Sequence, residues 1–351
     1  MGEKQIITPK TFLFNVLNGS AIAIIVGMIP NAILGELCKY LSQYNDIFAK
    51  IAIVVQGIQY TIPILTGVII AIQFGLGQLQ TAVVGAAAFV GSGATTITDN
   101  KWVITGIGDL INTMITAAIA VGIILLIKDR VENFNMIVLP IVGAGVAGLI
   151  GLLLLPYTKL ITVGIGNFVN SLTNTQPIIM TILIAMIFSI LIVSPISSIG
   201  IGVAIGISGL AAGSAAIGAG TCAIVLAVGA WRVNKVGVPI TVLLGAVKLM
   251  MPNTIRHPII FLPIVCSAAV SGLIGGLFNI KGAPDSAGFG LIGLVGPIKS
   301  LGLLDGGMAS GLVIVVITYI IVPLVAAIFF NYLFTKVLKL YDSEVFVFKS
   351  K

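Results

Sequence analysis

The sequence has little charge. Only 8% of its 351 residues are Asp, Glu, Lys or Arg, whereas soluble domains average about 25%. The hydrophobic share is 58%, and the mean hydropathy is +1.19. So few charged side chains cannot shield that much apolar surface from water. The composition therefore excludes a soluble enzyme, a nucleic-acid-binding module and a disordered tail, and it predicts a polytopic membrane protein.

Residues for metal, redox or nucleophilic chemistry are also scarce. The chain has one histidine and three cysteines, and Cys38, Cys222 and Cys266 are too far apart in the sequence for a metal or redox motif. We interpret the cysteines as small packing residues. No nucleophile motif and no paired carboxylates stand out. We therefore expect no catalytic residue in this chain, no cofactor and no metal.

Uncharged stretches mark the expected spans. A span needs about 20 residues. The stretch 11–35 is long enough for one span, 51–98 for two, and 160–231 for two or three. Further spans are expected over 135–156 and 306–335. We predict an all-α polytopic membrane protein of about ten transmembrane helices with one or two re-entrant hairpins. It would form a single integral membrane domain over the whole chain, without a soluble domain.

Short basic segments predict the orientation. The head carries Lys4 and Lys10, the loop after residue 231 carries Arg232 and Lys235, and the tail carries four lysines. By the positive-inside rule, all three segments are expected in the cytoplasm, with the chain in the cell membrane. We attribute the net charge of +7 to this bias, and we interpret the first apolar run as a retained span rather than a cleaved signal peptide.

The stretch 237–290 is interrupted by prolines. Pro252, Pro258 and Pro263 fall within a dozen residues, and proline removes a backbone donor and breaks helices. In hydrocarbon, a broken helix survives only where protein or a water-filled cavity satisfies its backbone. Ionisable residues lie in the same stretch, and at membrane depth such residues indicate a binding or transport path. The alternative interpretation is a solvated loop between two spans.

Five residues of this stretch form the predicted substrate site: Asn253, Arg256, His257, Lys248 and Asp285. Arg256 would hold a carboxylate, phosphate or polarised hydroxyl through its planar guanidinium. His257 would donate or accept a proton near neutral pH. Asn253 would do both toward a sugar hydroxyl, with Lys248 and Asp285 in support. The other interpretation of Asp285 is an ordinary turn residue.

Further polar features lie outside that stretch. Asp109 and Asn112 are one turn apart and share a helix face, which leaves them either facing a cavity or at the membrane interface. The segment 194–198 (SPISS) interrupts the longest uncharged stretch. The run 200–220 is so rich in Gly, Ala and Ser that it predicts helices packed at backbone contact.

Several stretches resemble the membrane-embedded enzyme IIC components of the sugar phosphotransferase system, especially the fructose type. Residues 17–27 are similar to the first span of that family, residues 62–72 to its PVLAGYIAYSIA stretch, and residues 245–276 to its segment around GAIP. The resemblance extends to a IIC-like branch that includes proteins described as perfringolysin O regulators. It implies a sugar path, separate cytoplasmic phosphate-donor or regulatory subunits as partners, contact with membrane lipid, and a homodimer.

The sequence departs from the family pattern at two places. Leu244 stands where the family has a glutamate before GAIP, and the stretch ILIVSPISSIG stands where the family has DMGGPVNK. The ionisable groups that remain are cationic and would prefer an anion. Besides a IIC-type permease for a sugar, two alternatives therefore stay open. One is a membrane sensor or regulator with a permease fold, and the other is a gradient-coupled carrier of a small organic anion.

Overall fold

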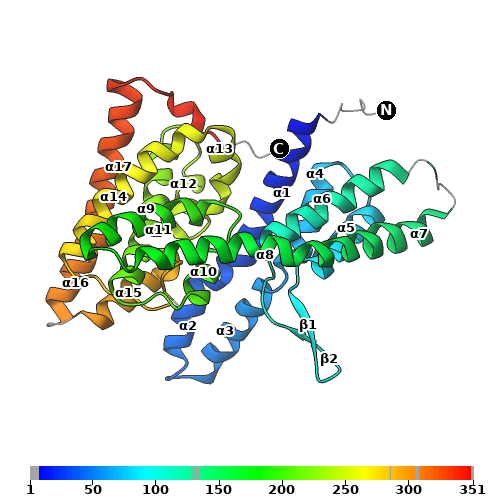
Figure 1. Ribbon diagram of the computed structural model, residues 1–351, viewed down its shortest axis with the longest axis horizontal. Coiled ribbons are helices and arrows are strands. Elements are labelled where there is room, and N and C mark those ends of the chain that lie inside the picture. The colour runs from blue at the N-terminus through cyan, green and yellow to red at the C-terminus, as the bar shows by residue number, and fades with distance from the viewer. Residues whose placement is uncertain (1–7, 128–129, 131–133, 285, 305–307, 349–351) are drawn as a thin grey trace. The chain divides into compact units, whose positions relative to one another are not determined.

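The chain forms two compact units, each described here by itself (Figure 1). The computed structural model describes residues 8–127, 130, 134–284, 286–304 and 308–348. Unit 1 consists of Met1–Met28 and Gly57–Lys159. Unit 2 consists of Ile29–Gln56 and Leu160–Lys351. The sequence predicts one membrane domain over the whole chain, and the division into two units leaves this prediction untested.

Unit 1 consists of helices and one short β-hairpin. Pro63 stands in the first turn of α4, where its missing N–H costs no hydrogen bond, and Gly75 follows the end of α4 with a φ of +66°. The elements of unit 1 are most of α1 (Pro9–Pro30), α4 (Ile62–Gln73), α5 (Gln78–Gly91), β1 (Thr95–Thr98), β2 (Lys101–Ile104), α6 (Leu110–Ile127), α7 (Asn135–Val138), η3 (Leu139–Val146) and the first half of α8 (Ala147–Leu172).

Asn112 joins three helices of unit 1. Its side-chain amide donates to the carbonyls of Gly91 at the end of α5 and Gly151 in α8, at 2.5 and 2.8 Å. Asp109 caps α6 by accepting the backbone N–H of Asn112 at 2.8 Å. At both glycines a side chain would overlap Thr116, so the three helices meet at close range. The Asp109–Asn112 pair therefore holds the helices of unit 1 together.

Unit 2 is larger and entirely helical where it is regular. Its elements are η1 (Asn31–Gly35), α2 (Glu36–Leu41), most of α3 (Asp46–Gln59), the second half of α8, α9 (Pro177–Val193), α10 (Ser198–Ala204), α11 (Gly209–Ala230), α12 (Gly237–Leu244), η4 (Val247–Met250), α13 (Met251–Arg256), η5 (Pro258–Ile260), α14 (Phe261–Leu277), η6 (Ile292–Leu294), α15 (Val295–Leu303), α16 (Met308–Val316), η7 (Ile317–Ile321), α17 (Val322–Tyr332), η8 (Leu333–Val337) and η9 (Ser343–Phe346).

The central helix of unit 2 is α11. It packs against α9, α12, α14 and α17, and 94% of its most apolar window is buried. A side chain at Gly218 would overlap the backbone of Ala185 in α9, and one at Gly213 would overlap the backbone of Ile280. Cys222 is buried in this helix as a free thiol. The predicted packing at backbone contact is therefore confirmed.

Six described helices are long and apolar enough to cross a membrane: Pro9–Pro30, Leu110–Ile127, Asn135–Leu172, Gly209–Ala230, Pro258–Leu277 and Ala309–Val337. A seventh is counted if α3 and α4 form one broken span. Three shorter apolar helices are Gln78–Gly91, Pro177–Val193 and Ile292–Leu303. The prediction of an all-α polytopic membrane protein is confirmed. The expected number of about ten helices is reached only when the shorter ones are included.

One local prediction was wrong. The span expected over 135–156 continues to the end of α8, because Pro156 lies inside that helix instead of ending it. Residues 95–104, in the connection between α5 and α6, form an antiparallel hairpin of β1 and β2. Asp99 and Asn100 both have positive φ, 50° and 58°, as a two-residue hairpin turn requires. The sequence signal for the hairpin was this Asp-Asn pair between two runs of β-branched residues.

The glycine contact between α11 and α9 gives a first prediction. Gly218→Ala is expected to lower the free energy of unfolding by about 1–3 kcal/mol, because the added methyl group forces two packed backbones apart. The matched control is Gly164→Ala in α8, where nothing lies within 4 Å of an added Cβ, and it should be neutral or slightly stabilising. Thermal unfolding in detergent measures both, and equal stability of the two variants would contradict the packing.

Candidate functional site

Residues 279–303 enter unit 2 and leave it at the same end. Gly282 pairs with the first residue of α11 through two backbone hydrogen bonds, at 2.9 and 3.0 Å. Further along, Gly290 lies against the middle of α11. Ser300 in α15 then returns to the start and donates its hydroxyl to the carbonyl of Lys281 at 2.8 Å. By its described residues this segment is a hairpin, called here the second hairpin because it follows another one in the sequence.

Residues 237–256 form another hairpin, called here the first hairpin. It enters as α12, turns at Gly245, whose φ is +147°, and returns as α13. Asn234, just after the end of α11, and Asn253, in α13, both bond to the tail segment 345–348. The entry and the exit of the first hairpin therefore lie at the C-terminal end of α11.

The two hairpins enter unit 2 from opposite ends. In Figure 1, α12 and α13 lie toward the top of unit 2 and α15 lies toward the bottom. Their tips approach each other, because Leu243 and Leu244 of the first hairpin line the same groove as Leu291 and Leu294 of the second. Opposed broken helices that meet inside a membrane protein are typical of binding and transport paths.

Lys248 lies at the tip of the first hairpin and is buried, with 8% of its surface exposed. Its ammonium donates to the carbonyls of Ser194 and Ile196, the second at 2.8 Å, in the break between α9 and α10. Carbonyls freed by a broken helix need donors, and a lysine provides three. Within the part of the chain that the structure describes, the partners of this ammonium are these carbonyl dipoles and no carboxylate.

The same break is tied to the second hairpin. Ser198 donates its hydroxyl to the carbonyl of Gly288 at 2.9 Å, while Ser197 caps α10 by accepting the N–H of Gly200 at 3.0 Å. We call Lys248, the segment 194–198 and Gly288 the hairpin junction. The sequence marks the serines and the proline of the break, but their partners lie 54 and 90 residues further on, where no local pattern indicates them.

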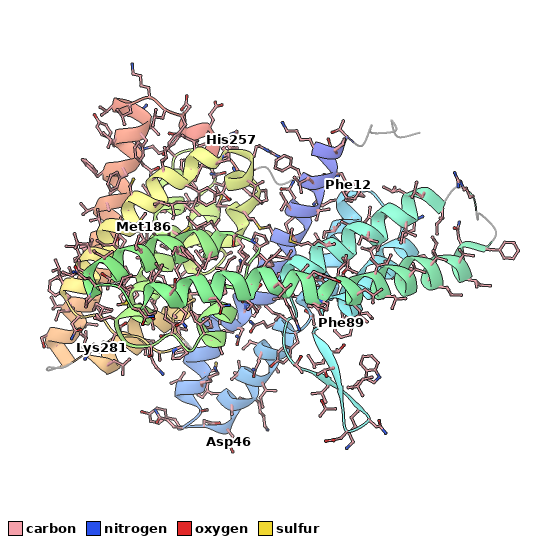
Figure 2. All side chains as sticks on the ribbon, in the orientation of Figure 1. Phe12, Asp46, Phe89, Met186, His257 and Lys281 are labelled. Atoms are coloured by element: carbon pink, nitrogen blue, oxygen red, sulfur yellow. The ribbon has the colours of Figure 1, made fainter. Side chains whose placement is uncertain are left out.

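The four predicted site residues that the structure describes do not form one group. Lys248 is at the hairpin junction, whereas Arg256 is exposed at the end of α13 and His257 is half-buried next to it. Asp285 lies outside the described residues. Figure 2 shows His257 and Lys281 at opposite ends of unit 2. They are separated by the 17 residues of α14, which span about 25 Å.

Asn253 binds the C-terminal tail. Its side-chain amide donates to the carbonyls of Val345 and Val347, both at 2.9 Å. Asn234 holds the other edge of this segment by donating to the carbonyl of Phe346 at 2.8 Å. The tail is thereby clamped between α13 and the loop that follows α11. The amide group predicted to meet a sugar hydroxyl is thus already engaged by the backbone of the chain itself.

Phe346 anchors the tail. Its side chain is fully buried against Gly229, where any side chain would overlap the ring. Tyr341 contacts the same ring edge-on, with the ring centroids 6.0 Å apart. Burial raises the pKa of Tyr341 above its ordinary value, which keeps the hydroxyl protonated. The tail and the loop with Arg232 and Lys235 therefore lie at one end of unit 2, as expected if both face the same side of the membrane.

The clamp gives a second prediction. Asn253→Ala removes two hydrogen bonds of about 1 kcal/mol each, so backbone hydrogen exchange over residues 343–348 should accelerate about tenfold or more. Asn167→Ala, on the exposed side of α8, is the matched control and should leave this exchange unchanged. Hydrogen–deuterium exchange with mass spectrometry measures both, and unchanged protection in Asn253→Ala would refute the clamp.

The comparisons with known proteins agree with this architecture. The family of phosphotransferase system EIIC components matches residues 14–348, which include both hairpins, the hairpin junction and the tail clamp. No curated protein and no solved structure gives a significant match. The resemblance to enzyme IIC components is thereby confirmed. The match is to the EIIC family as a whole, and a fructose-type specificity stays a prediction. The chain belongs to the phosphotransferase system EIIC family, as a multi-pass membrane permease component.

Proposed function

We propose that this EIIC chain carries a sugar across the cell membrane, for phosphorylation by separate cytoplasmic subunits of the phosphotransferase system. The observation that carries the proposal is the family match over nearly the whole chain, 14–348. The hairpin junction supports it, because a sugar needs hydrogen-bonding partners inside an apolar protein. Membership of the EIIC family supports separate cytoplasmic phosphate-donor subunits as partners.

Lys248 is the substrate-binding residue that we propose first. Two of its three N–H donors are directed to carbonyls of the broken segment. Its third donor is then free to meet a hydroxyl or an anionic oxygen of the substrate. Because the same ammonium joins the first hairpin to the end of α9, substrate binding and hairpin position would be coupled through one group. We infer that unit 2, which contains both hairpins, is the substrate-holding unit of the permease.

Arg256 and His257 have a different place in this proposal. They lie at the end of the first hairpin, where the tail is clamped by Asn253. We infer that this end of unit 2 faces the cytoplasm, because the basic loop and the lysine-rich tail are there. The two residues would then meet the phosphoryl group of the incoming donor subunit. Asp285 stays a predicted substrate residue, and the homodimer stays a proposal from the family.

A third prediction tests the role of Lys248. Lys248→Met should reduce sugar accumulation and phosphorylation by about 10- to 100-fold, because a hydrogen bond from a charged donor is lost. The readout is radiolabelled sugar uptake in cells that express the chain together with phosphate-donor subunits. Lys159→Met, an exposed lysine of α8, should keep full uptake. If Lys248→Met stays folded by size exclusion and thermal unfolding and transports at the original rate, the site is refuted.

One observation favours a second candidate, a carrier or sensor of an anion. The positive charge of Lys248 is balanced only by carbonyl dipoles in the described part of the chain, and such a group attracts anions. A fourth prediction separates the two. Thermal unfolding against neutral sugars, sugar phosphates and small organic acids should show a shift with a neutral sugar. A shift with anions alone would replace the sugar permease by the anion carrier or sensor.

A further inference from the structure

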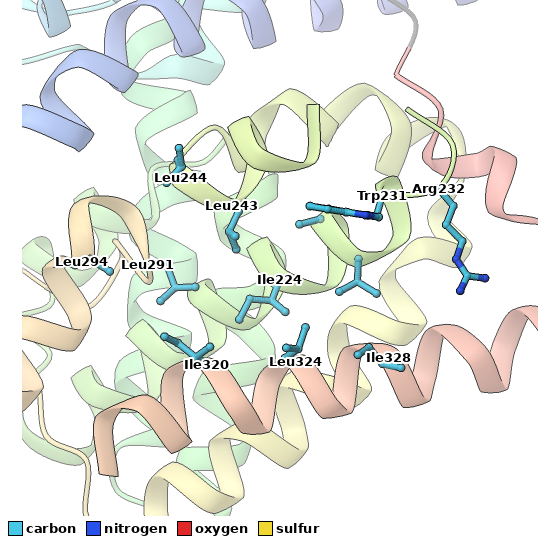
Figure 3. A pocket seen from close by; sticks show the side chains of 12 residues that line it. Ile224, Trp231, Arg232, Leu243, Leu244, Leu291, Leu294, Ile320, Leu324 and Ile328 are labelled. Carbon is cyan, nitrogen blue, oxygen red and sulfur yellow. The ribbon is translucent and has the colours of Figure 1, made fainter. Parts of the chain in front are cut away.

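An apolar groove of about 510 Å³ opens on one side of unit 2 (Figure 3). Its walls come from α11, α12, η6, η7 and α17. All the lining side chains are aliphatic except those of Trp231 and Arg232. Ile224 and Ala227 of the central helix are part of this lining and are almost fully buried, at 4% and 5% exposure. The groove therefore extends between α12 and α17 down to α11.

The aliphatic lining is unsuited to a sugar. A sugar hydroxyl buried there would lose its hydrogen bonds to water without finding a side-chain partner in the groove. The side chains of Leu324 and Ile328 on α17 are 40% and 54% exposed, and α17 belongs to the candidate membrane span Ala309–Val337. Exposed aliphatic residues on a membrane span face hydrocarbon. The chemistry of the groove thus fits a hydrocarbon chain.

One end of the groove is polar. Trp231 and Arg232 directly follow the last residue of α11, so they lie where this span reaches the membrane surface. Figure 3 shows the indole of Trp231 over this end and the guanidinium of Arg232 at the edge of the groove, beyond Ile328. Tryptophan is enriched at the level of lipid headgroups, and an arginine guanidinium binds phosphate through paired N–H donors.

We propose that this groove binds an anionic phospholipid, with one acyl chain along its aliphatic walls and the phosphate on Arg232. The argument for a lipid is charge complementarity: the lining has a single cation, at the surface end, and is apolar everywhere else. This is the pattern of an amphiphile with one anionic head. A bacterial inner leaflet supplies such lipids and attracts basic juxtamembrane residues. The acyl chain would contact Leu244 and Leu294, and so both hairpin tips.

The test uses the full chain purified in detergent. Thermal unfolding is followed with dioleoyl phosphatidylglycerol, with dioleoyl phosphatidylcholine and with soluble glycerol 3-phosphate, and native mass spectrometry counts retained lipids. The anionic lipid should raise the unfolding temperature more than the zwitterionic one, and glycerol 3-phosphate should have no effect. Arg232→Gln should reduce the shift from phosphatidylglycerol to that from phosphatidylcholine. Lys235→Gln, an exposed lysine of the same loop that does not line the groove, should keep the original preference.

The acyl-chain arm uses Leu324→Trp, which fills the groove from an exposed position and so leaves the core unchanged. It should abolish retention of both lipids, and Ile328→Trp provides a second variant of the same kind. Equal shifts with the two lipids in the unmodified chain would overturn the headgroup site. Undiminished lipid retention in both tryptophan variants would overturn the groove as its location. If both variants instead separate a dimer into monomers without changing lipid retention, the groove is an interface between two copies and the proposal fails.

Discussion

Inside a membrane, a backbone carbonyl that leaves a helix needs a donor from the protein or from water in a cavity. In unit 2 the helix break after α9 lies next to both hairpins, and this requirement determines how they meet. The Lys248 ammonium donates hydrogen bonds to the carbonyls after α9, and the Ser198 hydroxyl donates one to the carbonyl of Gly288. One buried cation thus makes the broken backbone tolerable and brings the first hairpin to the end of α9.

The depth of the second hairpin follows from the small residues of α11. Gly213 and Gly220 have no side chain, so the non-helical chain around Ile280 and Gly290 can lie directly on the backbone of this helix. Larger side chains at these positions would hold the hairpin several ångströms away, because helix radius and side-chain size set the contact distance. The glycine-rich composition, which is unfavourable for an isolated helix, is therefore what allows non-helical backbone to reach the middle of unit 2.

The hairpin tips present two different surfaces. Toward the end of α9 they offer an ammonium, serine hydroxyls and carbonyls, and toward α17 they offer four leucines. A polar solute and a lipid chain can therefore contact the same hairpins without competing for the same groups. At its exit, the first hairpin is held by Asn253, whose side-chain amide donates to the C-terminal tail. The tail is thus part of the support of the hairpin.

The sequence alone determined that this is a membrane protein, that it is helical and which family it resembles. Charge content, the lengths of uncharged runs and local motifs can all be read from short windows of sequence. It also indicated the helix breaks, since proline and glycine act on their own neighbourhood. Only the tertiary structure decided which polar residues meet. Lys248 pairs with a break 54 residues before it, and Asn253 pairs with a tail 92 residues after it. It also decided that His257 and Lys281 lie apart, because α14 keeps its two ends separate by its own length.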